Sequence, residues 1–317
     1  MSVRKILLII SIILFSIPES KAQFDAHFSN YFALQSLYNP ACSGKSDQLK
    51  IYAAYNMQLA GFKRAPSTMY AAVDMPFKLF QKKHGVGVGL YSDKIGLFTN
   101  QRIWAQYAYR TKLFGGQFSL GFQLGALNLS FDPSKLDLGE NVDASNDPAF
   151  PSTTVNGVSL DTGFGAYYAN KKFYAGFSAT HLTAPVVSLG ETNEMKIDPI
   201  IYFTSGCNIK TRNPLISIQP SMLLKTDMMS YKLDLTSRVF YKKGDKTFYG
   251  GLSYSPSTSV SFLAGVHMGK IRAGYAYEMY TSKVGIGNGS HDIYISYTVD
   301  MNFMSRSKNK HKSIRIL

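Results

Sequence analysis

The sequence predicts an all-β fold, a transmembrane antiparallel β-barrel of the outer-membrane type, and three observations lead to it. The N-terminus has the composition of an export signal. About fourteen later segments alternate apolar and polar side chains, as the strands of such barrels do. The connections between these segments alternate between short and long along the chain, which predicts short periplasmic turns and longer extracellular loops.

Residues 1–22 are predicted to be a secretory signal peptide that is cleaved on export. A basic start precedes an apolar run, Ile6 to Ile17, and small residues stand just before Gln23. No later stretch approaches the ~20 consecutive apolar residues that a membrane-spanning helix needs. The mature chain is therefore expected to be either soluble and exported or a barrel, because a closed barrel is the only other structure that spans lipid.

Alternation predicts a barrel domain over residues 48–303, and its last segment has the clearest pattern. Every second side chain from Ile293 to Phe303 is apolar, and the side chains between them include Asp292 and Asp300. Such a strand turns one face to lipid and the other to a polar lumen, with Phe303 in the aromatic girdle. The alternative is a secreted β-sandwich whose apolar faces pack on a core. The predicted strands are 49–58, 68–75, 85–91, 102–110, 117–130, 157–168, 173–181, 199–209, 215–225, 231–241, 247–254, 259–266, 271–280 and 291–303.

The connections on one side of the predicted barrel are short and basic, and they are assigned to the periplasm together with a basic C-terminal tail, 304–317. A basic surface of this kind suits an acidic partner, although it also suits ordinary solubility. The net charge is +14, but an exported protein rarely meets nucleic acid, so no nucleic-acid partner is expected. The predicted partner-binding residues are Lys82, Lys83, Lys171, Lys172, Lys242, Lys243, Arg306, Lys308, Lys310 and Lys312.

Three motifs lie between Phe28 and Phe98. The first is F-S-N-Y-F-A-L-Q-S-L-Y-N-P-A-C-S-G, in which Asn-Pro predicts a turn; the others are Q-L-A-G-F-K-R-A-P-S-T-M-Y-A-A-V-D-M-P-F and G-V-G-V-G-L-Y-S-D-K-I-G-L-F. Their order resembles the PorP/SprF family of Bacteroidetes outer-membrane proteins, which belongs to the type IX secretion system and the linked gliding motility machinery. The motif residues are Asn39, Pro40, Ala41, Gly44, Pro66, Asp93, Lys94 and Gly96.

This resemblance implies a non-enzymatic outer-membrane component of the type IX secretion system. Such a barrel would help to secrete or anchor surface adhesins and link the outer membrane to periplasmic machinery. The partners it implies are a periplasmic ring lipoprotein and its partner, a peptidoglycan-binding lipoprotein, a secreted adhesin or other cargo, and the bilayer with its lipopolysaccharide. The alternative is a transport barrel for small apolar solutes, in which a periplasmic N-terminal segment, 23–47, plugs the lumen.

The residues predict no catalysis, cofactor or metal site. No histidine stands at metal-ligand spacing from a second ligand, and there is no G-x-S-x-G elbow. Asp161, His181, Asp234 and His291 could be combined into a hydrolase site, but their spacing gives no support for one.

Three glycines, Gly85, Gly87 and Gly89, share one face of a predicted strand. Their favoured interpretation is relief of crowding inside the barrel. The alternative is the close approach of a plug or ligand backbone, which glycine in a strand also permits.

Overall fold

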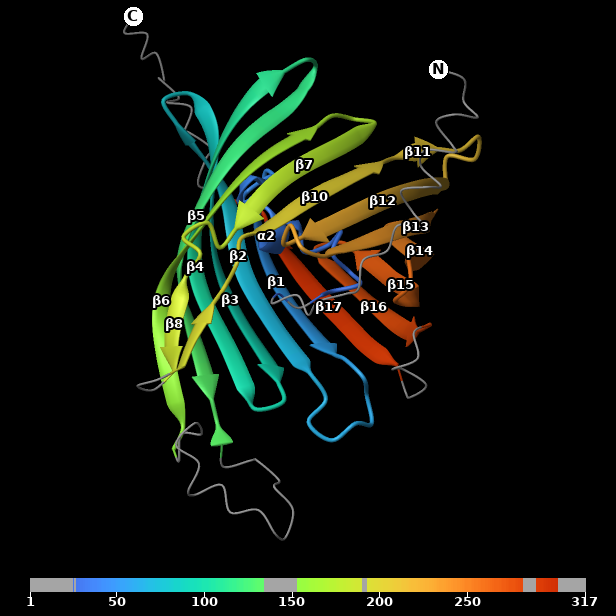
Figure 1. Cartoon of the computed structure of the whole chain (residues 1–317). Helices are drawn as coiled ribbons and strands as arrows, with labels where there is room; N and C mark the ends of the chain where they lie inside the picture. Colours follow the sequence, from blue (N-terminus) through green and yellow to red (C-terminus); the bar gives the residue numbers. More distant parts are fainter. Residues whose placement is uncertain (1–24, 26, 134–152, 190–192, 282–288, 302–317) are drawn as a thin grey trace, which may run out of the picture.

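The computed structural model describes residues 25, 27–133, 153–189, 193–281 and 289–301, and these form a closed antiparallel β-barrel (Figure 1). The first and last strands pair with each other, and β10 pairs with both β7 and β12. The two-residue β11 (Ile209–Lys210) continues β10 along β12, so the barrel has 14 strands, as the sequence predicts. The other barrel strands are β1 (Leu49–Met57), β2 (Ser67–Leu79), β3 (Lys82–Ile95), β4 (Phe98–Leu113), β5 (Gly116–Phe131), β6 (Val155–Ala169), β7 (Phe173–Thr180), β10 (Ile200–Cys207), β12 (Ile216–Thr226), β13 (Tyr231–Lys243), β14 (Lys246–Ser255), β15 (Ser259–Met268), β16 (Ile271–Tyr280) and β17 (Ser290–Val299).

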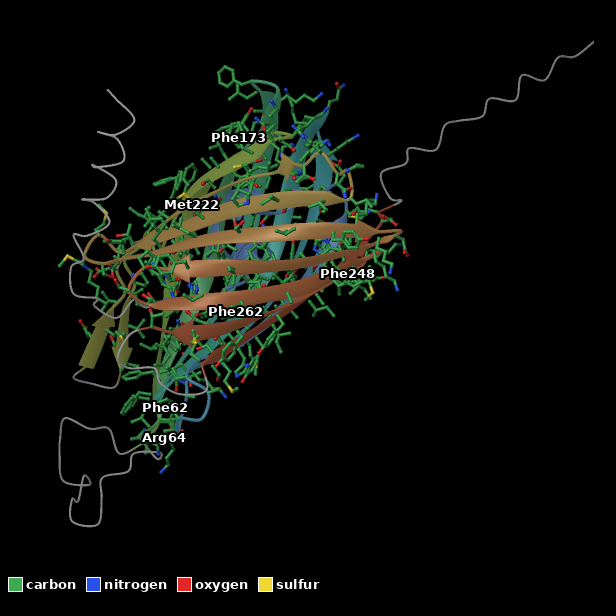
Figure 2. The ribbon with its side chains drawn as sticks, turned by 90° about the vertical axis from the view of Figure 1, so that its right-hand side faces the viewer. Phe62, Arg64, Phe173, Met222, Phe248 and Phe262 are labelled. Atoms are coloured by element: carbon green, nitrogen blue, oxygen red, sulfur yellow. The ribbon has the colours of Figure 1, made fainter. Side chains whose placement is uncertain are left out.

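Alternation along each strand separates an apolar outer surface from a polar lumen. On β17 the outward Ile293 is 52% exposed, whereas its neighbour Asp292 is buried inside. Phe248 and Phe262 likewise lie on the outside of their strands (Figure 2). An apolar surface of this extent belongs against lipid. The barrel prediction is confirmed and the sandwich alternative is wrong. Within the described ranges, no helix is long and apolar enough to cross a membrane.

Several strands run further than alternation predicts. The third continues through 82–95 rather than 85–91, because its polar ends keep pairing with both neighbours beyond the apolar band. The last strand is shorter than predicted. It ends before Asp300, which lies at the rim with its Oδ2 2.9 Å from Nζ of Lys270 rather than in the lumen. Phe303 and its predicted girdle position lie outside the described residues.

The two ends of the barrel differ. We call them the turn end and the loop end. The connections at the turn end are 80–81, 114–115, 170–172, 211–215, 244–245 and 269–270. The longest connections, 132–154 and 181–199, lie at the loop end, as do 58–66 and 281–289. One of them contains a hairpin that alternation did not predict, because each of its strands has only four residues: β8 (Val186–Leu189) pairs with β9 (Asn193–Lys196).

The N-terminal segment, which we define as Asp25 and residues 27–44, lies inside the barrel (Figure 1). It contains two short helices, α2 (Gln35–Tyr38) and the 3-10 helix η1 (Pro40–Cys42). The Asn-Pro pair sets this geometry. Proline at the first helical position needs no hydrogen bond, and the side chain of Asn39 accepts one from the backbone N–H of Ala41 at 2.9 Å.

Candidate functional site

The N-terminal segment is bonded to the barrel wall along its whole length. The backbone N–H of Asn30 donates to Asp292 at 3.0 Å, and that of Gly44 donates to Asp74 at 3.0 Å. Side chains of the wall also reach the backbone of the segment. Further contacts join Tyr31 with Ser221, Ser36 with Tyr70, Gln106 with the carbonyl of Ser36, and Ser178 with the carbonyl of Tyr38. Bonds between a backbone and a surrounding wall fix the position of the segment in the lumen.

Four glycines on strands β3, β5, β6 and β7 make room for the turn at 39–44, and we call them the glycine cradle. A Cβ built on Gly121 would lie 2.2 Å from the nitrogen of Ala41, and one on Gly165 would lie 2.1 Å from Oδ1 of Asn39. The other two members are Gly85 of β3, next to the carbonyl of Ser43, and Gly176 of β7, next to the side chain of Asn39. Every larger residue would push the turn away.

The favoured interpretation of the three glycines in the third strand, relief of crowding inside the barrel, is therefore wrong at Gly85. At Gly85 the reason for glycine is the close approach of the N-terminal backbone, since an added Cβ would lie 2.0 Å from the carbonyl oxygen of Ser43. At Gly89 the reason is crowding inside the barrel, because the indole ring of Trp104 would lie 2.5 Å from an added Cβ. The two interpretations apply to different glycines of one strand.

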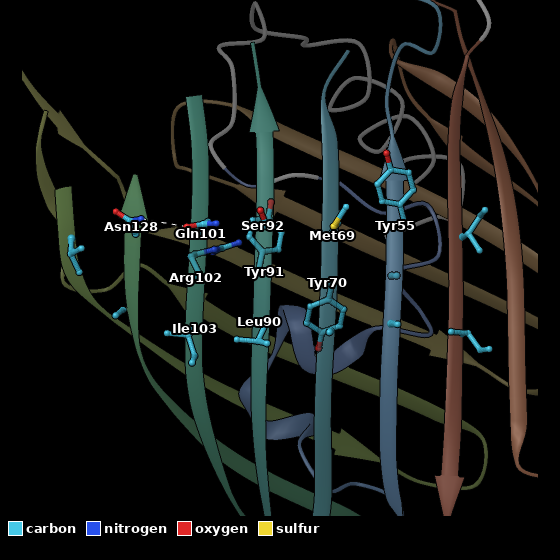
Figure 3. A pocket seen from close by; sticks show the side chains of 17 residues that line it. Tyr55, Met69, Tyr70, Leu90, Tyr91, Ser92, Gln101, Arg102, Ile103 and Asn128 are labelled. Carbon is cyan, nitrogen blue, oxygen red and sulfur yellow. Dashed lines mark hydrogen bonds between the residues drawn. The ribbon is translucent and has the colours of Figure 1, made fainter. Parts of the chain in front are cut away.

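A buried ionic cluster holds the start of the segment. The Arg102 guanidinium lies 2.8 Å from the Asp25 carboxylate and stacks on the ring of Tyr91, 4.1 Å from its centre (Figure 3). His181 places one ring nitrogen 3.4 Å from Asp25 and the other 3.0 Å from Asp161. Tyr202 donates to the same Asp25 carboxylate, and Lys225 donates to the backbone carbonyl of Asp25. We call Asp25, Arg102, Asp161, His181, Tyr202 and Lys225 the Asp25 cluster. It ties the segment to strands β4, β6, β10 and β12.

The cluster brings together Asp161 and His181, two of the four residues that a hydrolase site would need. Their partners are ionic groups of the wall and the N-terminal segment, and His181 is fully buried. Asp234 lies apart, 3.6 Å from His27, and His291 faces Tyr275. The arrangement is that of an anchoring network. Among the residues that the structure describes, no group of three or more His, Cys, Asp or Glu could hold a metal ion.

The loop end is covered from inside by the β8–β9 hairpin. Val187 and Leu189 of β8 are buried with Leu127 and Leu129, which point into the lumen from β5, and with Ile197 after β9. The side chains on this part of the lumen wall are apolar for that reason. Because the hairpin fills the lumen at the loop end, the wider part of the lumen that it and the N-terminal segment leave empty lies at the turn end.

That space is a cavity of about 500 Å³ at the turn end, between the N-terminal segment and strands β1, β6, β7 and β12 to β17. We call it the turn-end cavity. Its walls combine cations with aromatic rings, and the described residues that line it include no Asp or Glu. Its cations are Lys45, Lys50, Arg238, Lys242 and Arg272.

A second, larger hollow of about 770 Å³ lies on the wall at β1 to β6 and β17. Figure 3 shows the wall there, with Met69, Leu90 and Ile103 on adjacent strands. Its outward surface is apolar, and small side chains such as Ala53 and Ala71 leave the hollow between their larger neighbours. Lipid chains would fill such a surface in a membrane.

The predicted motif residues fall into two groups. Asn39, Pro40, Ala41 and Gly44 meet in the glycine cradle, where Gly44 has the positive φ of +60° that its turn requires. The other four lie at the loop end. There Pro66 precedes β2, Asp93 accepts from Thr68 at 2.7 Å, Lys94 pairs with Ser67 in the β-ladder, and Gly96 has φ +60°.

The predicted basic residues lie around the turn end. Lys82, Lys83, Lys171, Lys172, Lys242 and Lys243 are all there, and Lys242 also lines the turn-end cavity. Lys83 is paired with Asp47 at 2.7 Å, and its hydrogen bond holds the pKa of the Asp47 carboxyl below its ordinary value. Arg306, Lys308, Lys310 and Lys312 lie outside the described residues. The prediction missed the cavity cations Lys45, Lys50, Arg238 and Arg272, which become neighbours only through folding.

The solved structures that resemble this chain are outer-membrane barrels. The CymD monoaromatic hydrocarbon channel superposes with a TM-score of 0.52 at 11% identity over 87% of this chain and 95% of its own. The TodX monoaromatic hydrocarbon channel deltaS2 mutant gives 0.48 at 10% identity, covering 84% and 93%, and a Pseudomonas aeruginosa FadL homologue gives 0.47 at 11%, covering 83% and 92%. Identities this low indicate a shared fold alone.

No curated protein matches the sequence. A family profile described as type IX secretion system membrane protein PorP/SprF matches residues 20–297, which include the N-terminal segment and nearly the whole barrel. The motifs of the first hundred residues, their place in the glycine cradle and the 14-strand barrel agree with that match. The chain belongs to the PorP/SprF family of type IX secretion system membrane proteins.

Proposed function

We propose that this barrel is a non-enzymatic component of the type IX secretion system that helps to secrete or anchor surface adhesins and links the outer membrane to periplasmic machinery. Residues 1–22 direct export and are removed, and the turn end faces the periplasm, as short turns do in bacterial barrels. One observation carries the proposal: the chain's own N-terminal segment occupies the lumen, while the turn end stays open and basic.

The occupied lumen favours a docking role over conduction. A solute path would have to pass the N-terminal segment, which is bonded to the wall from the Asp25 cluster to Gly44, and then the β8–β9 hairpin. Residues 23–47 therefore act as a plug. A barrel of this width is too large for its wall side chains alone to fill, which gives such a segment its place.

The turn end has the composition of a binding surface. Phe80 and Phe114, at the tips of two turns, are both 88% exposed, and basic residues such as Lys82 and Lys83 stand beside them. Aromatic anchors next to charges of one sign are typical of a protein interface and of electrostatic steering. The proposed partners are the periplasmic ring lipoprotein with its partner and the peptidoglycan-binding lipoprotein.

A pull-down from the native outer membrane in mild detergent, read by mass spectrometry, tests the proposal. Type IX secretion proteins should be recovered with the tagged wild type and lost when the six turn-end lysines at 82, 83, 171, 172, 242 and 243 are changed to glutamine or when residues 306–317 are deleted. Lys63→Gln is the matched control, because Lys63 is exposed at the loop end. If the turn-end variants recover type IX proteins as well as the wild type does, the turn end is not the binding surface.

Transport of small apolar solutes is the second candidate. It is favoured by the likeness of the barrel to the CymD monoaromatic hydrocarbon channel and by the aromatic lining around the N-terminal segment. Uptake of a small aromatic hydrocarbon into proteoliposomes decides between the docking role and the transport role. Uptake that exceeds that of empty liposomes would support transport, whereas uptake equal to the empty control would leave the docking role as the function.

A further inference from the structure

The turn-end cavity contains a buried cation whose charge is not balanced. Arg238 is only 7% exposed, and its Nε has no hydrogen-bond partner in the part of the chain that the structure describes. Its guanidinium lies over the ring of Phe32, 3.5 Å from the ring centre, with Phe240 on another side at 5.4 Å. Aromatic contacts hold the group in place, but they do not replace a hydrogen-bonded anion around a desolvated guanidinium.

Two other arginines are buried in the lumen, and the Nε of each likewise lacks a hydrogen-bond partner among the described residues. Their guanidinium groups still have polar partners: that of Arg102 lies 2.8 Å from the carboxylate of Asp25, and that of Arg110 donates to the backbone carbonyl of Gly44. The described contacts of the Arg238 guanidinium are with the rings of Phe32 and Phe240. The turn-end cavity gathers five cations without an Asp or Glu among the described residues of its lining. Like charges this close repel one another, and an incoming anion would relieve that repulsion.

The walls indicate what the anion is attached to. Tyr52, Tyr174, Tyr294 and Phe240 line the cavity between the cations, so a ligand with apolar or aromatic groups beside its charge would contact them. Lys242 belongs both to the cavity and to the basic residues of the turn end, so the positive surface continues from the rim to Arg238. A peptide chain that carries several carboxylates can contact several of these cations at once, whereas a free ion binds at one place only.

We infer that the turn-end cavity receives an extended acidic peptide segment of a periplasmic partner protein, with one carboxylate bound to Arg238 and aromatic or apolar side chains against the tyrosines. This inference rests on the proposed function, in which the turn end docks a periplasmic partner. It adds the chemistry of the contact and the residue at its centre. The segment enters through the turn end and stops at the N-terminal segment.

Fluorescence anisotropy with the full-length barrel in detergent tests this inference. The probe is a fluorescein-labelled hexapeptide of alternating Glu and Phe, and the matched peptide has Gln in place of Glu. We expect saturable binding of the Glu peptide and binding about tenfold weaker in Arg238→Gln, as for loss of one charge-assisted hydrogen bond. Lys50→Gln, a second cavity variant, should weaken it too, and Lys63→Gln at the loop end should not. Retention of the heat-modifiable band on a gel shows that each variant is folded.

Two results would overturn the inference. One is equal binding of the Glu and Gln peptides, or binding that Arg238→Gln and Lys50→Gln leave unchanged. The other is binding of inorganic phosphate, measured by calorimetry, that requires Arg238 while neither peptide binds, because the cavity would then be a site for a free anion.

The pull-down separates this inference from the proposed function. If type IX proteins are recovered as well by Arg238→Gln as by wild type, the cavity contact is refuted while the docking role stands. If the peptide binds in an Arg238-dependent way and no type IX protein is recovered, the site stands and the partner assignment fails.

Discussion

Gly121→Ala should release the N-terminal segment from the glycine cradle. The new Cβ would lie 2.2 Å from the nitrogen of Ala41 and 2.4 Å from the carbonyl carbon of Pro40, both of them backbone atoms. Ordinary contacts begin near ~3.4 Å, so the turn must move by roughly 1 Å. A movement of this size breaks the bond from Asn39 to the carbonyl of Phe177, now 3.3 Å.

The magnitude follows from the cost of overpacking. Inserting a methyl into a filled site costs about 1–3 kcal/mol, and 1.4 kcal/mol is a factor of about ten, so the undocked population should rise roughly 5- to 150-fold. The chain contains its own probe, because Cys42 is a free thiol of the segment and is 2% exposed when docked. Replacing the exposed Cys207 by serine leaves Cys42 as the sole thiol of the chain.

The assay is the rate of Cys42 alkylation in detergent. In the Cys207→Ser background, Gly121→Ala should accelerate the alkylation of Cys42 roughly 5- to 150-fold, because the thiol is modified only when the segment undocks locally. Gly250→Ala is the matched control, because its added Cβ would meet only the carbonyl oxygen of Leu263, at 3.9 Å. An unchanged alkylation rate in folded Gly121→Ala, or an equal rise in Gly250→Ala, would refute the docked position of the segment.

Two further predictions concern the ends of the barrel. Val187→Asn places a polar amide side chain in the apolar contact between the β8–β9 hairpin and the barrel wall. At a cost of about 1–3 kcal/mol, the hydrogen exchange of the backbone amides of the hairpin should become roughly 5- to 150-fold faster. Val186→Asn, on the exposed face, should leave the exchange rate within about threefold of wild type, and equal rates in the two variants would contradict the packing. At the turn end, Lys83→Gln should return the lowered pKa of Asp47 toward its ordinary value, measured by NMR of the carboxyl carbon. The stabilisation from this pair is present above about pH 4 and is lost as pH falls through the lowered pKa, so the two proteins should differ in stability only above that pH.

Local pattern was enough to predict the barrel wall. The side-chain period of two follows from strand geometry, so residues such as Ile293 and Asp292 could be assigned to faces without any knowledge of their neighbours. The β8–β9 hairpin was missed because each of its strands has four residues, which are too few to establish a period of two. Strand ends were misplaced where polar residues continue a ladder, since hydrogen bonding rather than hydrophobicity decides the end of a strand.

The lumen could be predicted only in part. Asn39, Pro40 and Gly44 were singled out as turn residues, and the structure adds that their turn fits against glycines more than forty positions later in the chain. The Asp25 cluster joins residues up to 200 positions apart, so no spacing rule could have found it. The cations of the turn-end cavity are Lys45, directly after the N-terminal segment, and residues of β1, β13 and β16, and a sequence shows their charge but not their convergence.

We propose that the turn end contacts type IX machinery in the periplasm. Site-specific photo-crosslinking in living cells tests it most directly, with benzoylphenylalanine placed at Phe80 and Phe114 of the turn end and, as control, at Phe62 of the loop end, which is 53% exposed. We expect crosslinks from Phe80 or Phe114 to a periplasmic type IX lipoprotein and none from Phe62. Crosslinks to such a lipoprotein from Phe62 alone, or from neither end in cells that secrete normally, would contradict it.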